Sequence, residues 1–176
     1  MTQNGFNAVE RALRHQTFGT LSTLSKQGRP HATGVVYAVS PKGEPLILYV
    51  TTRTTTRKVR NVRAHPDVAF VVPVPRRLIP GFPPRAVQFQ GTATVVPGDH
   101  TQALRAFASS WFLRRILVAE QRIVTQGGDL CFICIRPDRT VFTYGIGMSL
   151  WHNVRQPRDA IGRVIRDDGL SKGRIP

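Results

Sequence analysis

One stretch of the sequence, Thr51–Phe70, combines the residue types that bind an anion. It reads TTRTTTRKVRNVRAHPDVAF, and its first acidic residue is Asp67. The basic positions are Arg53, Arg57, Lys58, Arg60 and Arg63. Hydroxyl groups, guanidinium groups and backbone amides that meet at the start of a helix are the donors that a phosphate needs. We therefore predict an anion-binding corner where this stretch enters a short helix.

The composition also favours an anionic partner. Lys and Arg number 25 against 10 Asp and Glu, which gives a formal net charge of +15. So large an excess favours nucleic acid, an acidic lipid surface or a polyanionic small molecule as partner. The sequence has no apolar run long enough to cross a membrane, and its first residues lack the apolar core of a signal peptide. We expect a cytoplasmic protein with no membrane partner.

The two cysteines, Cys131 and Cys134, lie in the apolar segment LCFICI. In a strand, their odd spacing places the two thiols on opposite faces, where they cannot share a metal ion or easily form a disulfide. We interpret them as small buried hydrophobic side chains. The five histidines are scattered without metal-ligand spacing, so we expect no metal site.

The hydrophobic pattern predicts helices and strands in an order typical of a small antiparallel barrel. Helices are expected at 7–16, with Asn7 as the cap, at 55–65, and at 100–123 with a break near Ser109–Ser110. Strands are expected at 18–24, 31–39, 46–52, 67–74 and 85–96, followed by a hairpin of 129–137 and 139–145. At 176 residues, the chain is long enough for one domain with its own core.

Several short motifs follow one another in the order of a known family. They are Phe18–Leu24, Gly28–His31, Val35–Tyr37, Lys58–Arg63, and Pro66 with Val68. With these motifs the chain resembles the split β-barrel flavoproteins related to pyridoxamine 5′-phosphate oxidase, a group that includes the branch using the deazaflavin coenzyme F420. The resemblance implies a mainly β fold with helices: a six- to seven-stranded antiparallel split β-barrel of the FMN-binding type, with peripheral helices. We assign residues 1–147 to this cofactor-binding domain and expect 148–176 to be a basic, partly disordered extension.

The resemblance also implies a cofactor and the residues that would hold it. The cofactor is FMN or F420, which share a phosphate and a similar tricyclic ring, in a groove between the subunits of a homodimer. By position, Lys58 would contact the phosphate and Asn61 would brace that corner by hydrogen bonding. Gly34 would let a flat ring approach the backbone of the second strand closely. The candidate cofactor-binding residues are Thr33, Gly34, Val35, Val36, Thr51, Thr52, Arg57, Lys58 and Asn61.

A cofactor of this kind carries its own electron chemistry, so we expect no catalytic side chains. In agreement, the sequence has no G-x-S-x-G, P-loop, H-E-x-x-H or G-x-G-x-x-G motif. We predict an FMN- or F420-dependent oxidoreductase acting on a small organic substrate. A non-catalytic flavin- or F420-binding carrier is the alternative, and a nucleic-acid-binding protein is a remote one, because no nucleic-acid-binding motif is present. The loop at 73–86, with Arg76, Arg77 and Arg85, departs from the family pattern and leaves the substrate undetermined.

Overall fold

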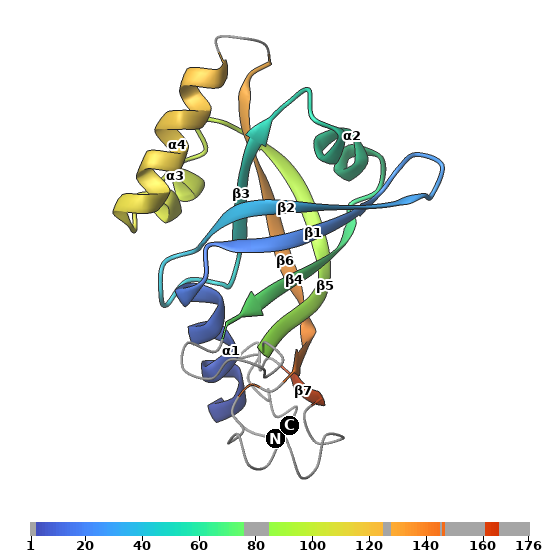
Figure 1. Cartoon of the computed structure of the whole chain (residues 1–176), viewed down its shortest axis with the longest axis vertical. Helices are drawn as coiled ribbons and strands as arrows, with labels where there is room; N and C mark the ends of the chain where they lie inside the picture. The colour runs from blue at the N-terminus through green and yellow to red at the C-terminus, as the bar shows by residue number, and fades with distance from the viewer. Residues whose placement is uncertain (1–2, 76–84, 125–127, 145, 147–160, 166–176) are drawn as a thin grey trace, which may run out of the picture.

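The structure is a computed structural model that describes residues 3–75, 85–124, 128–144, 146 and 161–165. The strands are β1 (Phe18–Leu24), β2 (Pro30–Val39), β3 (Leu48–Arg53), β4 (Asp67–Val74), β5 (Arg85–Pro97), β6 (Leu130–Tyr144) and β7 (Ile161–Ile165). They form one antiparallel sheet in the order β3-β2-β1-β4-β5-β6-β7. Because β3 also pairs with β6, the first six of these strands close into a barrel (Figure 1).

The barrel closes because its strands alternate between apolar inward positions and polar or small outward positions. In β4, for example, Val68, Phe70 and Val72 are buried, while Val71 and Pro73 are exposed. The inward side chains of the other strands join them in one core. The register of every strand is therefore set by which of its two faces is apolar.

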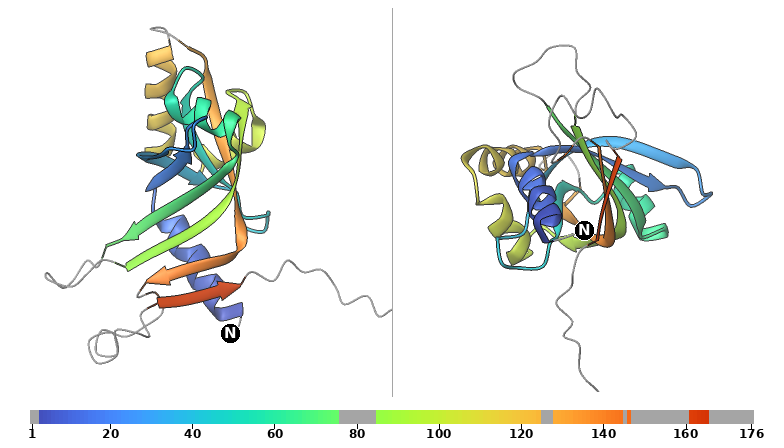
Figure 2. Two further views of the ribbon diagram at one scale, coloured as in Figure 1. Left: turned by 90° about the vertical axis from the view of Figure 1, so that its right-hand side faces the viewer. Right: turned by 90° about the horizontal axis from the view of Figure 1, so that it is seen from below.

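Helices cover the two ends and one side of the barrel (Figure 2). At one end, α1 (Gln3–His15) adds Val9 and Leu13 to the interior core, and at the other end α2 (Arg57–Ala64) adds Val59 and Val62. On the outside, α3 (Thr101–Phe107) and α4 (Trp111–Val124) pack over β2, β3 and β6. Their contact forms a second core of buried side chains: Ala38, Tyr49, Ala103, Ala106, Phe107, Leu113, Phe132 and Cys134.

The predicted fold class is confirmed, and so is the break in the long helix, where α3 ends at Phe107 and α4 begins at Trp111. The two cysteines lie on opposite faces of β6, as predicted. Cys131 belongs to the core inside the barrel and Cys134 to the core under α3 and α4, and both are free thiols. Asn7 is not a cap, because α1 already begins at Gln3 and places Asn7 on its exposed side.

The predicted hairpin at 129–145 is wrong, because β6 runs through it as one strand of 15 residues. The segment after Pro137 that suggested a turn is a bulge. Phe89 pairs with Val141 and Gly91 with Pro137, so one residue of β5 faces three of β6. Gly91 permits this approach, since a Cβ there would lie 3.0 Å from the carbonyl carbon of Arg136 and closer still to its oxygen.

The C-terminal extension contributes a strand that the sequence prediction did not include. Within it, β7 pairs antiparallel with the second half of β6, from Thr140↔Ile165 to Tyr144↔Ile161. Residues 148–160 and 166–176 lie outside the described residues, as do Arg76 and Arg77 of the proline-rich loop. No helix among the described residues is both long and apolar enough to cross a membrane.

Candidate functional site

The barrel is split where β2 and β3 separate. The ladder between them holds only three pairs, from Val39↔Leu48 to Tyr37↔Val50. Beyond it, β2 continues from Val36 back to Pro30 paired with β1 alone, while the end of β3 stays paired with β6. One backbone edge of β2 thus has no neighbouring strand in the described part of the chain. An edge of this kind leaves backbone N–H and C=O groups free to bind a ligand.

The helix α2 begins beside this split, directly after β3 (Figure 1). Its N-cap residue, Thr56, makes no side-chain hydrogen bond to the helix. The Thr56 hydroxyl instead donates to the carbonyl of Arg53 at 2.9 Å and lies 3.1 Å from the Thr52 hydroxyl. The first-turn amides of α2 therefore lack a side-chain cap, and the positive end of the helix dipole is open to an anion.

Lys58 is half-buried in the first turn of α2. Burial lowers the pKa of its ammonium group, and Arg53 lowers it further, while Glu120 and Cys131 act in the opposite direction. No hydrogen bond or ion pair joins the Lys58 side chain to any other described residue. Lys58 is thus a partly desolvated cation without a partner, which is the state expected of a group that receives an anion.

The two predicted hydroxyls differ in availability. Thr51 lies on the face of β3 against which α4 packs, and it is only 8% exposed. Its Oγ1 is buried without a hydrogen-bond partner, an arrangement that is costly unless a ligand or water completes it. Thr52 points to the opposite face, where its hydroxyl already interacts with Thr56. Thr51 is therefore the hydroxyl of the pair that is free to bind.

Asn61 faces the barrel rather than the open side of α2. It is 5% exposed, and its Nδ2 donates to the Thr23 hydroxyl at 2.9 Å. Thr23 in turn donates to the carbonyl of His31 at 3.3 Å. This chain of bonds joins α2 to β1 and β2 and so fixes the position of the helix start. Arg57, by contrast, is exposed at the first position of α2.

The four candidate residues of β2 alternate between the two faces of the strand. Val35 belongs to the interior core, and Thr33 has the same orientation. Gly34 and Val36 face outward, toward the side of α3 and α4. A Cβ on Gly34 would lie 2.7 Å from the ring of Phe18, which is itself 54% exposed. A flat aromatic group therefore does approach the strand at Gly34, and in this structure it is Phe18.

One known protein family matches most of this chain. Residues 7–144 match the family model described as pyridoxamine 5′-phosphate oxidase. The chain belongs to this family. Among curated proteins, none matches the chain.

Solved structures of the same fold have different ligands in their names. One is the heme storage protein HutZ from Vibrio cholerae, with a TM-score of 0.62 and 18% identity over 80% of this chain and 95% of the other. A heme-binding protein from Mycobacterium smegmatis has a TM-score of 0.65 and 16% identity over 94% of this chain and 59% of the other. An FMN-binding, pyridoxamine 5′-phosphate oxidase-related protein from Nostoc punctiforme has a TM-score of 0.56 and 14% identity over 94% and 91%. At these identities the similarity shows the fold alone.

Two further charged groups act on the α2 corner. Arg53 and Glu120 act electrostatically on Lys58. Arg53 belongs to the basic run, but β4, β5 and α3 separate Glu120 from Lys58 in the sequence, and no local pattern links the two. Arg85, whose Nε is buried without a partner, is not part of this corner, because it pairs with Val74 at the end of β4 that lies away from α2. The described residues contain no group of three or more His, Cys, Asp or Glu side chains that could hold a metal ion.

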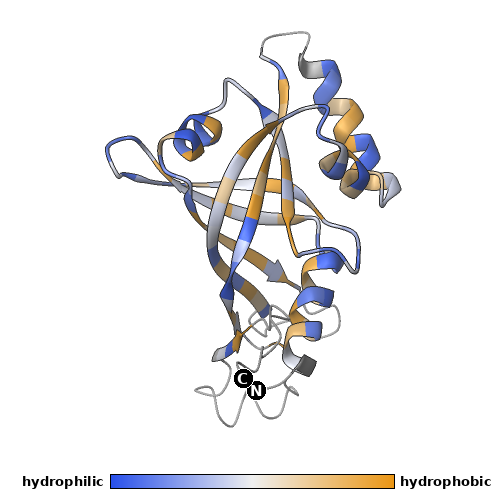
Figure 3. Ribbon diagram, turned by 180° about the vertical axis from the view of Figure 1, so that it is seen from behind, coloured by the Kyte–Doolittle hydropathy of each residue, from blue (hydrophilic) through white to orange (hydrophobic). Residues whose placement is uncertain are grey.

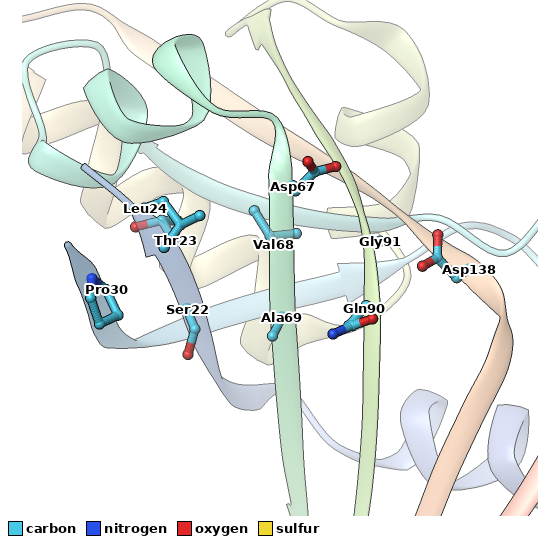
Figure 4. Close-up of a pocket in the computed structure, with 10 residues that line it drawn as sticks. All are labelled: Ser22, Thr23, Leu24, Pro30, Asp67, Val68, Ala69, Gln90, Gly91 and Asp138. Atoms are coloured by element: carbon cyan, nitrogen blue, oxygen red, sulfur yellow. The ribbon is translucent and has the colours of Figure 1, made fainter. Parts of the chain in front are cut away.

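A separate hollow of about 340 Å³ lies on the outer face of β1, β4, β5 and the bulge of β6 (Figure 4). Its charged lining residues are Asp67 and Asp138, and Gln90 and Gly91 of β5 also line it. With two carboxylates and no cation in its lining, this hollow does not suit a phosphate. The α2 corner is the better candidate site for a phosphate-bearing cofactor of this family.

Proposed function

We propose that the protein is an oxidoreductase that uses FMN or F420 to oxidise or reduce a small organic substrate. The observation that carries the proposal is the unpartnered cationic corner at the start of α2, next to the open backbone edge of β2. Family membership supports a cofactor of the flavin type. The phosphate of such a cofactor would need the cations, and its ring would need the open backbone edge next to them.

The described residues fit the phosphate end of such a cofactor. Lys58 and the uncapped amides of α2 would bind the phosphate oxygens, and the buried hydroxyl of Thr51 would gain the partner it lacks. Arg57 would add a second, exposed cation. Asn61 would act through the helix, because its bond to Thr23 holds α2 against the barrel. Thr52 has the weakest claim, since its hydroxyl is already engaged.

The backbone of Thr33, Gly34, Val35 and Val36 would face the cofactor ring along the unpaired edge of β2. When bound, the cofactor supplies hydride or electron transfer. The protein would hold the ring in place, keep water away from it and leave one side accessible to substrate. Phe18 would lie next to the ring, in contact with Gly34.

We also propose that a second copy of the chain completes the groove. One row of neighbouring residues crosses the outer face of the sheet: Gly34, Thr20, Val71, Gln88 and Phe142. These five residues of β2, β1, β4, β5 and β6 carry no charge, and the row ends at the exposed Arg163 of β7, which pairs with Phe142. Val71 and Phe142 are exposed apolar residues in that row. An uncharged, partly apolar face suits a homodimer interface, and Val71→Asp should yield a monomer in sedimentation velocity.

The absorbance spectrum of the protein as isolated tests the cofactor assignment. A flavin and a deazaflavin have distinct visible bands, and heme has an intense band that differs from both. The proposal expects either a flavin or a deazaflavin band, or saturable binding when FMN or F420 is added. Failure to bind either compound, or preferential binding of heme, would refute it.

Turnover distinguishes the enzyme from its main alternative, a carrier that binds the same cofactor without catalysis. The enzyme should accelerate reoxidation of the reduced cofactor by at least one small organic acceptor over the rate of the free cofactor. A carrier would bind the cofactor tightly and leave that rate unchanged. In the carrier case the cofactor site at α2 stands, and the oxidoreductase assignment fails.

A further inference from the structure

The helix α4 presents large apolar side chains to solvent. Trp111 is 64% exposed, Phe112 45% and Val118 46%. The opposite side of the helix is buried, with Leu113 in the second core and Leu117 packed against it. Figure 1 shows α4 on the outside of the molecule, at the opposite side from the β1–β2 turn, and Figure 3 shows hydrophobic and hydrophilic residues intermixed along it.

Basic side chains surround these apolar groups. Arg114 and Arg115 are exposed, and the Arg115 guanidinium lies 4.8 Å from the centre of the Trp111 ring. The single acidic residue of α4, Glu120, is half-buried and acts on Lys58 of α2. We call Trp111, Phe112, Arg114, Arg115 and Val118 the α4 surface. It carries positive charge and exposed aromatic rings, with no acidic residue among its members.

A hollow of about 290 Å³ lies beside the start of α4. It is lined by residues of the β2–β3 turn, the end of α1 and the α3–α4 turn, among them Lys42, Arg14 and Ser109. Arg14 is bonded to Glu10 and to the carbonyl of Ser40. Lys42 is exposed and forms no hydrogen bond or ion pair with the described residues. A further cation is thus available next to the α4 surface.

Although the sequence alone predicts no membrane partner, we propose that the α4 surface docks on the face of a lipid bilayer that carries anionic headgroups. Tryptophan and phenylalanine insert at the boundary between headgroups and acyl chains, and arginine and lysine attract the anionic headgroups. A second copy of the chain is a poorer occupant of this surface, because it would bring the same two exposed arginines to the contact. Single-stranded nucleic acid is also poorer, since stacking on bases makes no use of Val118.

Vesicle flotation of the full chain tests this surface. One set of vesicles contains phosphatidylcholine alone, and the other contains an equal mixture of phosphatidylcholine and phosphatidylglycerol. The chain has two tryptophans, so Trp151→Phe leaves Trp111 as the sole reporter of its own environment. We expect binding to the anionic vesicles, a shift of the Trp111 emission to shorter wavelength, and quenching by brominated lipid.

Paired variants separate the α4 surface from net charge. Each basic residue near an anionic surface strengthens membrane binding by roughly fivefold. The double variant Arg114→Gln with Arg115→Gln should therefore lower the partition coefficient of the protein onto anionic vesicles by about 30-fold. Lys26→Gln with Arg29→Gln removes the same charge from the distant β1–β2 turn and should have a much smaller effect. Trp111→Ala with Phe112→Ala should abolish the emission shift and most of the binding. All of these side chains are exposed, and circular dichroism checks that each variant is folded.

Several results would overturn the proposal. Equal binding to neutral and anionic vesicles would show that anionic headgroups are not recognised. Equal loss of binding in the two charge-removal variants would show that the α4 surface is not the docking site. A change in sedimentation coefficient on replacing Trp111 and Phe112, without vesicle binding by the parent chain, would assign the face to a second copy. Binding of a single-stranded oligonucleotide without vesicle binding would assign it to nucleic acid. These outcomes are independent of cofactor binding at α2.

Discussion

Replacing Lys58 with alanine removes the only half-buried cation of α2, whose three arginines are all exposed. In the ligand-free protein, burial lowers the pKa of this ammonium group, and no described side chain pairs with it. We therefore expect the Lys58 ammonium group to interact favourably with a phosphate once one is bound. A hydrogen bond to a charged group contributes about 1.5–3 kcal/mol, so the Kd for FMN should rise by about 10- to 150-fold in Lys58→Ala.

Fluorescence titration with FMN and with riboflavin isolates this effect, because riboflavin has the ring but lacks the phosphate. The Kd for riboflavin should change little in Lys58→Ala, whereas the Kd for FMN should rise. Lys26→Ala, which removes one exposed lysine from the β1–β2 turn, is the control for net charge. If Lys58→Ala weakened FMN and riboflavin equally, or if it left the Kd for FMN unchanged, the phosphate would not lie at α2.

The lowered pKa also predicts the effect of Lys58 on stability. The folded state disfavours the charged form relative to the unfolded state, so the free energy of unfolding should rise as the pH increases from the lowered pKa to the ordinary lysine value. Lys58→Met should accordingly raise the Tm of the ligand-free protein at neutral pH while it weakens FMN binding. A lower Tm would contradict the inference that the cost of desolvating this cation exceeds its attraction to Glu120.

Three further predictions concern the fold around the site. Asn61→Ala should lower the free energy of unfolding by about 1–3 kcal/mol, because it leaves the buried hydroxyl of Thr23 without its donor. In urea denaturation, a double-mutant cycle with Thr23→Val should show that the two side chains are energetically coupled. Gly91→Ala should lower the free energy of unfolding by about 1–3 kcal/mol, because the new Cβ would meet the backbone of the β6 bulge. Gly5→Ala is the control: it lies in α1, a Cβ there has ordinary contacts, and the change should stabilise the protein. Burial raises the pKa of the Cys134 thiol from 9.0 to about 11. The free energy of unfolding should therefore fall as the pH rises between these two values. Thermal melts over this pH range should show a smaller fall for Cys134→Ala.

The sequence was sufficient to predict those elements in which local pattern and tertiary environment agree. The strand Asp67–Val74 alternates apolar and polar residues, and it forms β4 with the predicted bounds. The basic helix is also where the pattern places it, with Val59 and Val62 buried and Arg57 and Arg63 exposed. In both cases the apolar residues have one face of the element to bury, so the local pattern decides the structure.

The hairpin at 129–145 could not be predicted because its outcome depends on a distant strand. The segment after Pro137 has the composition of a turn, yet β5 pairs with both halves of β6 and holds them in line. The extra residues are absorbed in a bulge at Gly91. A residue that is far away in sequence thus decides between a turn and a bulge, and no local pattern contains that information.

The sequence indicated which strands and which helix carry the candidate residues, but not which contacts each side chain makes. Thr51 and Thr52 look equivalent in sequence, but they point to opposite faces, and Thr56 already engages Thr52. Asn61 is a bridge to Thr23 inside the barrel, which depends on how α2 packs on β1. These distinctions arise from strand direction and helix packing, which the sequence specifies only through the complete fold.

Crystals of the protein soaked with FMN provide the most direct test of the central claim. We predict that the phosphate lies against the first turn of α2, within hydrogen-bonding distance of Lys58 Nζ, with the ring along the unpaired edge of β2 beside Gly34. An FMN phosphate bound elsewhere, such as at the loop arginines or in the hollow between Asp67 and Asp138, would contradict the proposed site.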